Sequence, residues 1–329
     1  MTGADHRAAP ARATIGVDLG GTKLLVGVVD DAGQTVHRRS ARSAGLAPDE
    51  LLALVESELA VALEAHPQAA AIGLGVPCTI DRAGGVCVNA VNLPLVDVPL
   101  RDRFTGRFGI PVSIDNDANV AAIAEARRGA ARGARNLVLL TIGTGIGGGL
   151  ILDGRPYRGA HGAGAELGHV VVDINGPPCQ GNCPNRGCIE AVASGTALAV
   201  EAERAAAAAP GSPLGRAAAE GASLDGRLVT ELARGGDAGS VAVLETIGRR
   251  LGVALSGLAN VFDPDAIVLG GGVMAAGELL LGPAREELRT RALPPQNATP
   301  VHAAELGGDA GMIGAAILAA DELAERAAA

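Results

Sequence analysis

Apolar and polar positions near the start of the chain follow the pattern of a β-meander. Apolar runs over residues 13–19 (ATIGVDL) and LLVGVVD flank a two-glycine turn, and a third run, QTVHRRS, follows the turn DAG. The pattern predicts three antiparallel strands rather than a strand that feeds a helix. Residues 49–65 have a helical period and an acidic first turn. Residues 71–76 and PVSIDND are expected to be buried strands, and the second leads into a helix that we expect to close at Gly133.

The same pattern then begins again. NLVLLTIG predicts a strand, GTGIGGG a turn and LILDG a second strand. Helical stretches follow from about 194 to 260, with residues 211–226 expected to be a loop. A short buried strand at 266–269 and helices at about 277–292 and 309–327 complete the chain.

A strand, a glycine turn and a second strand therefore occur twice, at 13–29 and 136–152. We interpret this as an internal duplication of a βββαβα unit within an α/β fold, with two lobes facing each other across a cleft. Residues 1–12 are expected to be a disordered lead, 13–114 a small lobe and 115–308 a large lobe, with the link near Asp115.

Composition limits the classes of partner. The 329 residues include 48% hydrophobic positions but no Trp, one Tyr and three Phe, so ligand recognition must rely on hydrogen bonds rather than on aromatic stacking. The net charge is 27 − 36 = −9, and no basic cluster interrupts it, which argues against nucleic acid as a partner. No apolar run reaches the length of a membrane span or forms a signal peptide, so we expect a cytoplasmic protein.

The first glycine turn, GVDLGGTK, carries groups that suit a phosphate. Gly20 and Gly21 allow backbone N–H groups to approach an anion, and Thr22 and Lys23 add a hydroxyl and a cation. Asp18 ends the preceding strand, where it can hold Mg²⁺ directly or through water. The order of a Walker A loop is absent, and an ordinary hairpin with a two-glycine turn remains the alternative.

The second glycine turn, TIGTGIGGG at 141–149, matches the spacing G-x-G-x-x-G. A dinucleotide fingerprint must open a helix, whereas this segment leads into the strand LILDG, so we reject a dehydrogenase. We expect its backbone N–H groups, at Thr144, Gly145 and Gly147, to hold phosphate. A third run that includes Gly271 and Gly272 follows a strand and can lie against adenine or ribose, although it also suits an ordinary turn.

Residues 114–119, IDNDAN, place several polar side chains where a buried strand meets a helix. A helix N-cap needs only one of them. A carboxylate here can accept the proton of a sugar hydroxyl as that oxygen attacks phosphorus, and Asp117 is our candidate base. Asn116 and Asn119 are expected to bind sugar or to fix the helix start, and capping alone suits Asp115 or Asn119.

Four soft ligands are spaced as H-x₉-C-x₃-C-x₄-C, from His169 through Cys179 and Cys183 to Cys188. This set fits a tetrahedral structural Zn²⁺ site, which would order the irregular segment GPPCQGNCPNRGC. Three reduced thiols in a loop are the alternative. Glu166 and Glu190 lie beside this cluster in sequence, and two rigidly held carboxylates suit a polyol, although they can also be solvated surface acids.

The motifs DLGGTK, NDAN, TIGTGIGGG, ELGH and the cysteine cluster ending in CIE, in this order, resemble the ROK family of bacterial sugar kinases and repressors. The resemblance runs from about residue 13 to 327 and includes LGGGV at 269–273. It implies the two-lobed, actin-like ATPase fold of hexokinases, with the last helix packed on the small lobe. The family's usual cysteine pattern is C-x-C-x₄-C, and here the first gap is three residues.

The resemblance also implies roles for individual residues. Asp117 would be the catalytic base, and the sugar contacts would come from Asn92, Asn116, Asp117, Glu166, His169 and Glu190. His169 would bind zinc and orient a sugar hydroxyl through its other ring nitrogen. ATP with Mg²⁺ would be the donor, a hexose the acceptor, and a homodimer or dimer of dimers the assembly.

The expected activity is transfer of the ATP γ-phosphoryl group to a hexose, with glucose at O6 favoured. Fructose, N-acetylglucosamine and N-acetylmannosamine are alternative acceptors, and polyphosphate is an alternative donor. A sugar-sensing repressor of the same family is a rival from another class. Such repressors carry a winged helix before the sugar domain, and about a dozen residues precede the first strand here. Asp117 also favours catalysis.

Overall fold

The computed structural model describes residues 13–90 and 92–328, and the expected disordered lead lies outside them. The chain forms two compact units. One comprises the chain up to Val120 together with Gly311–Ala329, and the other comprises Ala121–Ala310. The division thus falls a few residues after the boundary predicted at 114/115, and the action of the two units as lobes stays a prediction.

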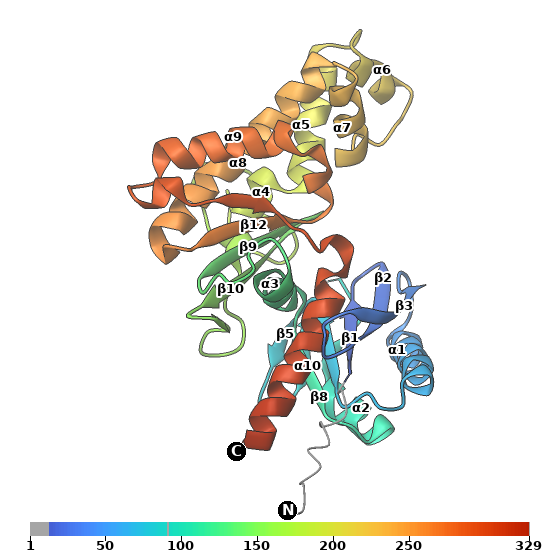
Figure 1. The fold of residues 1–329 in the computed structure, drawn as a ribbon. Helices are drawn as coiled ribbons and strands as arrows, with labels where there is room; N and C mark the ends of the chain where they lie inside the picture. The colour runs from blue at the N-terminus through green and yellow to red at the C-terminus, as the bar shows by residue number, and fades with distance from the viewer. Residues whose placement is uncertain (1–12, 91, 329) are drawn as a thin grey trace, which may run out of the picture. The chain divides into compact units, whose positions relative to one another are not determined.

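A five-stranded sheet forms the centre of the first unit (Figure 1), with the order β3-β2-β1-β4-β8. The first three strands are an antiparallel meander, and β4 and β8 run parallel to β1. The strands are β1 (Thr14–Leu19), β2 (Lys23–Val29), β3 (Thr35–Arg42), β4 (Ile72–Val76) and β8 (Val112–Asn116). The predicted meander is therefore present, as are the two later strands.

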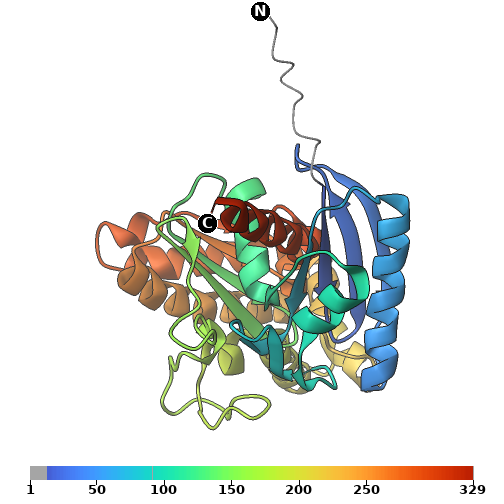
Figure 2. The same ribbon diagram turned by 90° about the horizontal axis from the view of Figure 1, so that it is seen from below.

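Two long helices cover opposite faces of this sheet (Figure 2). Helix α1 (Pro48–Ala65) packs Leu51, Val55 and Leu59 against one face, and α10 (Ala310–Ala328) lies on the other. The unit also contains α2 (Leu100–Phe108) and a three-stranded sheet of β5 (Cys78–Asp81), β6 (Val86–Ala90) and β7 (Val96–Val98), which sequence patterns did not predict.

Helix α10 approaches the sheet closely because glycines line the contact. A Cβ added to Gly73 would lie 1.8 Å from the carbonyl oxygen of Ala315, and one on Gly16 would lie 1.9 Å from that of Met312. On the helix itself, a Cβ on Gly314 would lie 1.7 Å from the carbonyl oxygen of Val120. A side chain at Gly16 or Gly73 would push α10 off the sheet, and one at Gly314 would push it off the helix that begins at Asp117.

Replacement of Gly73 by Ala is expected to destabilise the protein by about 3 kcal/mol, because overpacking of this kind cannot be relieved by a side-chain rotation. Gly106, an exposed residue of α2 whose added Cβ would contact nothing within 4 Å, is the matched control. Gly106→Ala should stabilise by about 0.5–1 kcal/mol. Denaturant unfolding measures both, and equal stability of the two variants would contradict this packing.

The second unit repeats the topology of the first. Its sheet has the order β11-β10-β9-β12-β13, again an antiparallel meander followed by strands parallel to the first one. The strands are β9 (Leu137–Ile142), β10 (Ile146–Leu152), β11 (Arg155–Pro156), β12 (Ala266–Gly270) and β13 (Val301–Ala303). The two matching strand orders confirm the predicted duplication.

Helices pack on this sheet around one apolar core. They are α4 (Ile189–Ala193), α5 (Gly195–Ala208), α6 (Pro213–Ala219), α7 (Gly226–Arg234), α8 (Ala238–Phe262) and α9 (Glu278–Arg291), with 3₁₀ turns at Leu167–His169, Gly272–Ala276, Gln296–Ala298 and Gly307–Asp309. Among the residues that the structure describes, no helix is both long enough and apolar enough to cross a membrane.

Three predicted boundaries were wrong. The expected loop at 211–226 contains α6, whose N-cap Ser212 accepts a hydrogen bond from the Gly215 backbone. The second glycine turn is shorter than expected because β10 already begins at Ile146. Helix α3 (Asp117–Arg128) ends before Gly133. The buried carboxylate of Glu125 causes the early end, because it accepts a hydrogen bond from the Ala130 backbone at 2.8 Å.

Candidate active site

Asp117 stands where strand β8 of the first unit ends and helix α3 begins. It is half-buried, and its Oδ1 accepts a hydrogen bond from the Ala118 backbone at 2.9 Å. The Oδ1 atom of Asn116 accepts from the same N–H at 2.9 Å and from that of Asn119 at 3.4 Å. Asn116 therefore caps the helix through its carbonyl oxygen, and this cap does not use its Nδ2 group.

The other polar residues of this segment are buried and support it. Asp115 and Asn119 are each 2% exposed, and the Asn119 Nδ2 group donates to Asp115 Oδ1 at 3.0 Å. Asn119 thus fixes the helix start, one of the two roles expected for it, and is too buried for the other, sugar binding.

The first glycine turn is a tight reversal between β1 and β2. The Gly20 N–H donates to the Lys23 carbonyl at 2.9 Å, and the side chains of Thr22 and Lys23 are exposed. Ser43 holds the turn from outside: its hydroxyl donates to the Gly20 carbonyl at 2.7 Å and its N–H to the Thr22 carbonyl at 3.2 Å. Sequence reasoning missed Ser43, because no motif marks a residue that reaches the turn from the end of a neighbouring strand.

Asp18 and Asn92 flank this turn within the same unit. The Asp18 carboxylate lies beside the start of α10, where a Cβ on Gly311 would come within 2.6–3.0 Å of its atoms. A helix N-terminus favours a nearby negative charge. A Cβ on Gly21 would lie 3.0 Å from the carbonyl oxygen of Asn92, so the loop that carries Asn92 packs on the glycine turn.

In the second unit, Gly143–Gly145 form the turn between β9 and β10, and Glu190 packs against it. The Glu190 Oε2 atom accepts from the Ile146 N–H at 2.8 Å, and a Cβ on Gly145 would lie 2.2 Å from that oxygen. The Gly143 carbonyl accepts from the Gly195 N–H at 2.8 Å. Glu190 is therefore half-buried and held by the turn, not a freely solvated acid.

The later glycines of the run make room for the segment that carries Glu166 and His169. A Cβ on Gly148 would lie 2.7 Å from the Leu167 side chain, and one on Gly168 would lie 2.1 Å from the Ile146 carbonyl oxygen. Because β10 follows the turn directly, the G-x-G-x-x-G spacing here reflects packing of this segment on a strand and not a dinucleotide fingerprint.

Glu166 projects from this segment at a sharp bend. Its backbone angles, φ −70° and ψ 57°, are those of an inverse γ-turn, and the Leu167 N–H donates to the Ala165 carbonyl at 2.7 Å. Ala165 has φ +66°, a strained value for a non-glycine residue. The Glu166 side chain is exposed, and three residues later the His169 ring is half-buried.

The third glycine run follows β12. Gly271 has φ +90°, and a Cβ there would lie 2.3 Å from the Ile142 carbonyl oxygen, so only glycine fits. Gly272 opens a 3₁₀ turn and is exposed, and a Cβ on it would meet nothing within 4 Å. The backbone of Gly272 is thus open to a ligand, whereas Gly271 serves the turn.

The structure brings His169, Cys179, Cys183 and Cys188 together, with their ligand atoms all within 4.8 Å of one another. The Sγ atoms of Cys183 and Cys188 are 3.9 Å apart, and Cys179 Sγ is 3.5 Å from His169 Nδ1. Tetrahedral zinc bond lengths would separate two sulfur ligands by about 3.8 Å and a sulfur from a nitrogen ligand by about 3.5 Å. The cluster therefore fits zinc, even with a three-residue first gap.

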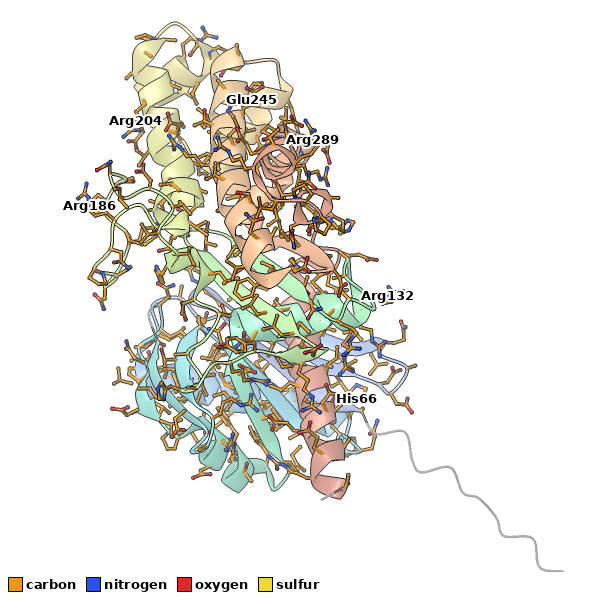
Figure 3. The ribbon with its side chains drawn as sticks, turned by 90° about the vertical axis from the view of Figure 1, so that its left-hand side faces the viewer. His66, Arg132, Arg186, Arg204, Glu245 and Arg289 are labelled. Atoms are coloured by element: carbon orange, nitrogen blue, oxygen red, sulfur yellow. The ribbon has the colours of Figure 1, made fainter. Side chains whose placement is uncertain are left out.

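The backbone around the cluster is a folded-over loop. Residues Val171 and Cys188 form one antiparallel bridge and Pro178 and Arg186 another, and Arg186 lies at the surface of the loop (Figure 3). Burial raises the pKa of the Cys179 thiol to about 12 and also raises the pKa of Cys188. A bound cation would offset this cost of deprotonation and so hold the loop closed.

Comparisons with known proteins agree with these motifs. The model of the ROK family matches residues 14–322. The glucokinase of Thermotoga maritima is 37% identical over 311 residues, which are 93% of this chain and 97% of that protein. The glucokinase of Streptomyces coelicolor is 36% identical, with 93% and 97% covered.

A solved structure is similar over the same span. The crystal structure of a ROK family glucokinase from Streptomyces griseus, in complex with glucose and AMPPNP, has a TM-score of 0.81 and 36% identity, and the match covers 94% of this chain and 99% of that one. From its motifs, its duplicated fold and these relatives, the chain belongs to the ROK family.

Proposed function

We propose that this protein is an ATP-dependent glucokinase that converts glucose into glucose 6-phosphate. The observation that carries the proposal is Asp117, a half-buried carboxylate at the junction of β8 and α3, in a chain similar to glucokinases over more than nine-tenths of its length. An acid at the carboxyl end of a parallel strand suits a base for an incoming hydroxyl.

In the proposed reaction, Asp117 accepts the proton of the glucose 6-hydroxyl while that oxygen forms a bond to the γ-phosphorus of ATP. The bond between the γ-phosphorus and the β,γ-bridging oxygen breaks, and ADP leaves. The Nδ2 group of Asn116 is positioned by its own capping bond and would donate to a neighbouring hydroxyl. Asn92 would add a further contact from its loop.

Glu166, His169 and Glu190 would bind the remaining sugar hydroxyls. Since His169 Nδ1 lies toward Cys179, its Nε2 would serve the sugar. Glu190 has one carboxylate oxygen held by the Ile146 N–H, which fixes the orientation of the other. Rigid acceptors of this kind discriminate between hydroxyl arrangements, because a misplaced hydroxyl leaves a polar group without a partner.

The glycine turns would hold the nucleotide through the backbone N–H groups of Gly20, Gly21, Thr22, Lys23, Thr144, Gly145, Gly147, Gly271 and Gly272. Asp18 would hold Mg²⁺, whose chemistry when bound is to neutralise phosphate charge. Zinc, held by His169 and the three cysteines, would order the loop that carries the sugar-binding residues. With free sugar and ATP as substrates, we expect the enzyme in the cytoplasm, and the homodimer stays a prediction.

The experiment that tests this proposal is an ADP-release assay over a panel of sugars with ATP as donor. Glucose is expected to have the highest kcat/KM, ahead of fructose, mannose, N-acetylglucosamine and N-acetylmannosamine. A higher kcat/KM for another hexose would make that hexose, and not glucose, the assigned substrate. Phosphorylation of no sugar at all, with glucose still bound, would replace the kinase by a sugar sensor, and turnover with polyphosphate alone would replace ATP as donor.

A further inference from the structure

The carboxylate of Asp115, two residues before Asp117 in the chain, is buried. It is 2% exposed, and Arg82 Nη1 donates to its Oδ2 at 3.0 Å. Its Oδ1 accepts from the Asn116 N–H at 2.8 Å and from the Asn119 Nδ2 group at 3.0 Å. A buried carboxylate needs such partners because desolvation of an unpaired charge is costly.

These hydrogen bonds hold the chain on both sides of Asp117. Oδ1 of Asp115 binds the residue before Asp117 and, through Asn119, the first turn of the helix after it. The Asn116 side chain then caps Ala118. The backbone position of Asp117 therefore depends on the orientation of the Asp115 carboxylate.

Arg82, which orients that carboxylate, is itself held in the turn between β5 and β6. The carbonyl oxygens of Arg82 and Ala83 accept from Arg101 Nη2 at 2.6 Å and Nη1 at 3.0 Å, and the Arg101 N–H donates to Gly85 at 3.1 Å. Gly85, at φ +67°, allows this approach, since a Cβ there would lie 2.4 Å from Arg101. The other terminal nitrogen of the Arg82 guanidinium, Nη2, donates to the carboxylate of Glu322 in α10 at 2.6 Å.

We propose that Arg82 is a positioning residue for phosphoryl transfer, acting through Asp115 on the placement of Asp117. The inference rests on the proposed function, because it assumes that Asp117 is the base. A shift of about 1 Å in a reacting group can lower a rate about 100-fold, so the fixed guanidinium of Arg82 controls kcat without touching the substrate.

A purely structural role would run through Glu322 instead. Glu322 also accepts from Ser113 at 2.7 Å, so its pair with Arg82 ties α10 to the sheet and to the β5–β6 turn. The two roles separate because Glu322→Gln weakens the tie to α10 but keeps the hydrogen bond between Arg82 and Asp115, whereas Arg82→Met removes both.

The experiment compares kcat, the glucose dissociation constant from calorimetry, and unfolding stability across four variants. Arg82→Met is expected to lower kcat about 10–100-fold with the dissociation constant changed less than about twofold. Arg82→Lys keeps the positive charge but lacks the planar guanidinium that can bridge two carboxylates. Its kcat should therefore lie between the kcat of Arg82→Met and that of wild type. Glu322→Gln should lower stability and leave kcat within about threefold.

Arg103→Met is the matched control, because it removes an Arg–carboxylate pair of the same unit, with Glu56 at 2.7 Å, that touches no proposed site residue. It should leave kcat unchanged. Equal losses of kcat in Arg82→Met and Glu322→Gln, or unchanged kcat in Arg82→Met, would overturn the inference. If Arg82→Met does not fold, Arg82→Lys decides by the same criteria.

Hydrogen exchange separates failure of this inference from failure of the proposed function. The amides of Asn116 and Asn119 should exchange faster in the Arg82 variants than in wild type, in Arg103→Met and in Glu322→Gln. Unchanged exchange would overturn the positioning role whatever the activity. Faster exchange in a protein that phosphorylates no sugar would support the control of this segment by Arg82 and contradict the kinase assignment alone.

Discussion

Asp117→Asn is expected to abolish nearly all glucose phosphorylation while glucose still binds. The amide has the same size, and its oxygen can still accept from the Ala118 N–H, but it cannot take the hydroxyl proton. Loss of a general base lowers a rate about 10²–10⁴-fold. Steady-state kcat measures the loss, and calorimetry with glucose measures binding, which should change by less than about threefold since proton transfer belongs to the transition state.

The matched control is Asp102→Asn, an exposed carboxylate in the first turn of α2 in the same unit. Its kcat should equal that of wild type. A kcat for Asp117→Asn above about a tenth of the wild-type value would be too high for loss of a general base and would contradict the assignment. If glucose affinity falls by the same factor as kcat, Asp117 would be a sugar-binding residue, and the assignment as a base would not be supported.

Loss of zinc from the cysteine cluster is expected to lower the catalytic efficiency strongly. Purified protein should contain about one zinc ion per chain, and Cys188→Ser should contain almost none, because all four ligands are needed to fill a structural site. The kcat/KM for glucose should fall about 10–100-fold, since His169 loses the loop that holds it. Elemental analysis and the glucose titration measure the two effects together.

Cys78→Ala is the control for this variant. Cys78 is a buried thiol of β5 in the other unit and belongs to no ligand set, so its removal should leave the zinc content unchanged. Treatment with a strong chelator should reproduce the Cys188→Ser kinetics, and added zinc should restore them. A metal-free protein with full kcat/KM would show that the loop is ordered by its backbone bridges alone.

Local sequence patterns predicted the strands of both sheets, because the apolar runs and glycine turns that mark these strands are adjacent in the chain. Glycine turns between apolar runs marked both meanders, and the acidic start of α1 marked that helix. The end of α3 escaped prediction because Glu125 terminates it through backbone groups at 130, 305 and 306, two of which lie far away in the chain. The packing of α10 on the sheet depends likewise on Gly16 and Gly73, and no local sequence pattern connects these glycines to the helix.

The sequence likewise predicted some residues of the candidate site and missed others. The cysteine spacing predicted a metal cluster, and the four ligand atoms do converge. Asp117 stood out because two carboxylates ended one buried strand. In contrast, Arg82 and Ser43 act on the site through contacts across 33 and 23 positions, and neither stands in a recognisable motif. Support for the segment that carries Asp117 comes from tertiary contacts, which a single sequence does not reveal.

Identification of the product formed from ATP and glucose is the decisive measurement for glucokinase activity. With equimolar ATP and glucose, phosphorus NMR and mass spectrometry should detect ADP and glucose 6-phosphate in equal amounts, and Asp117→Asn should form about 10²–10⁴-fold less of both in the same time. Release of inorganic phosphate without a sugar phosphate, or a phosphate attached at another carbon of glucose, would contradict phosphoryl transfer to the glucose 6-hydroxyl.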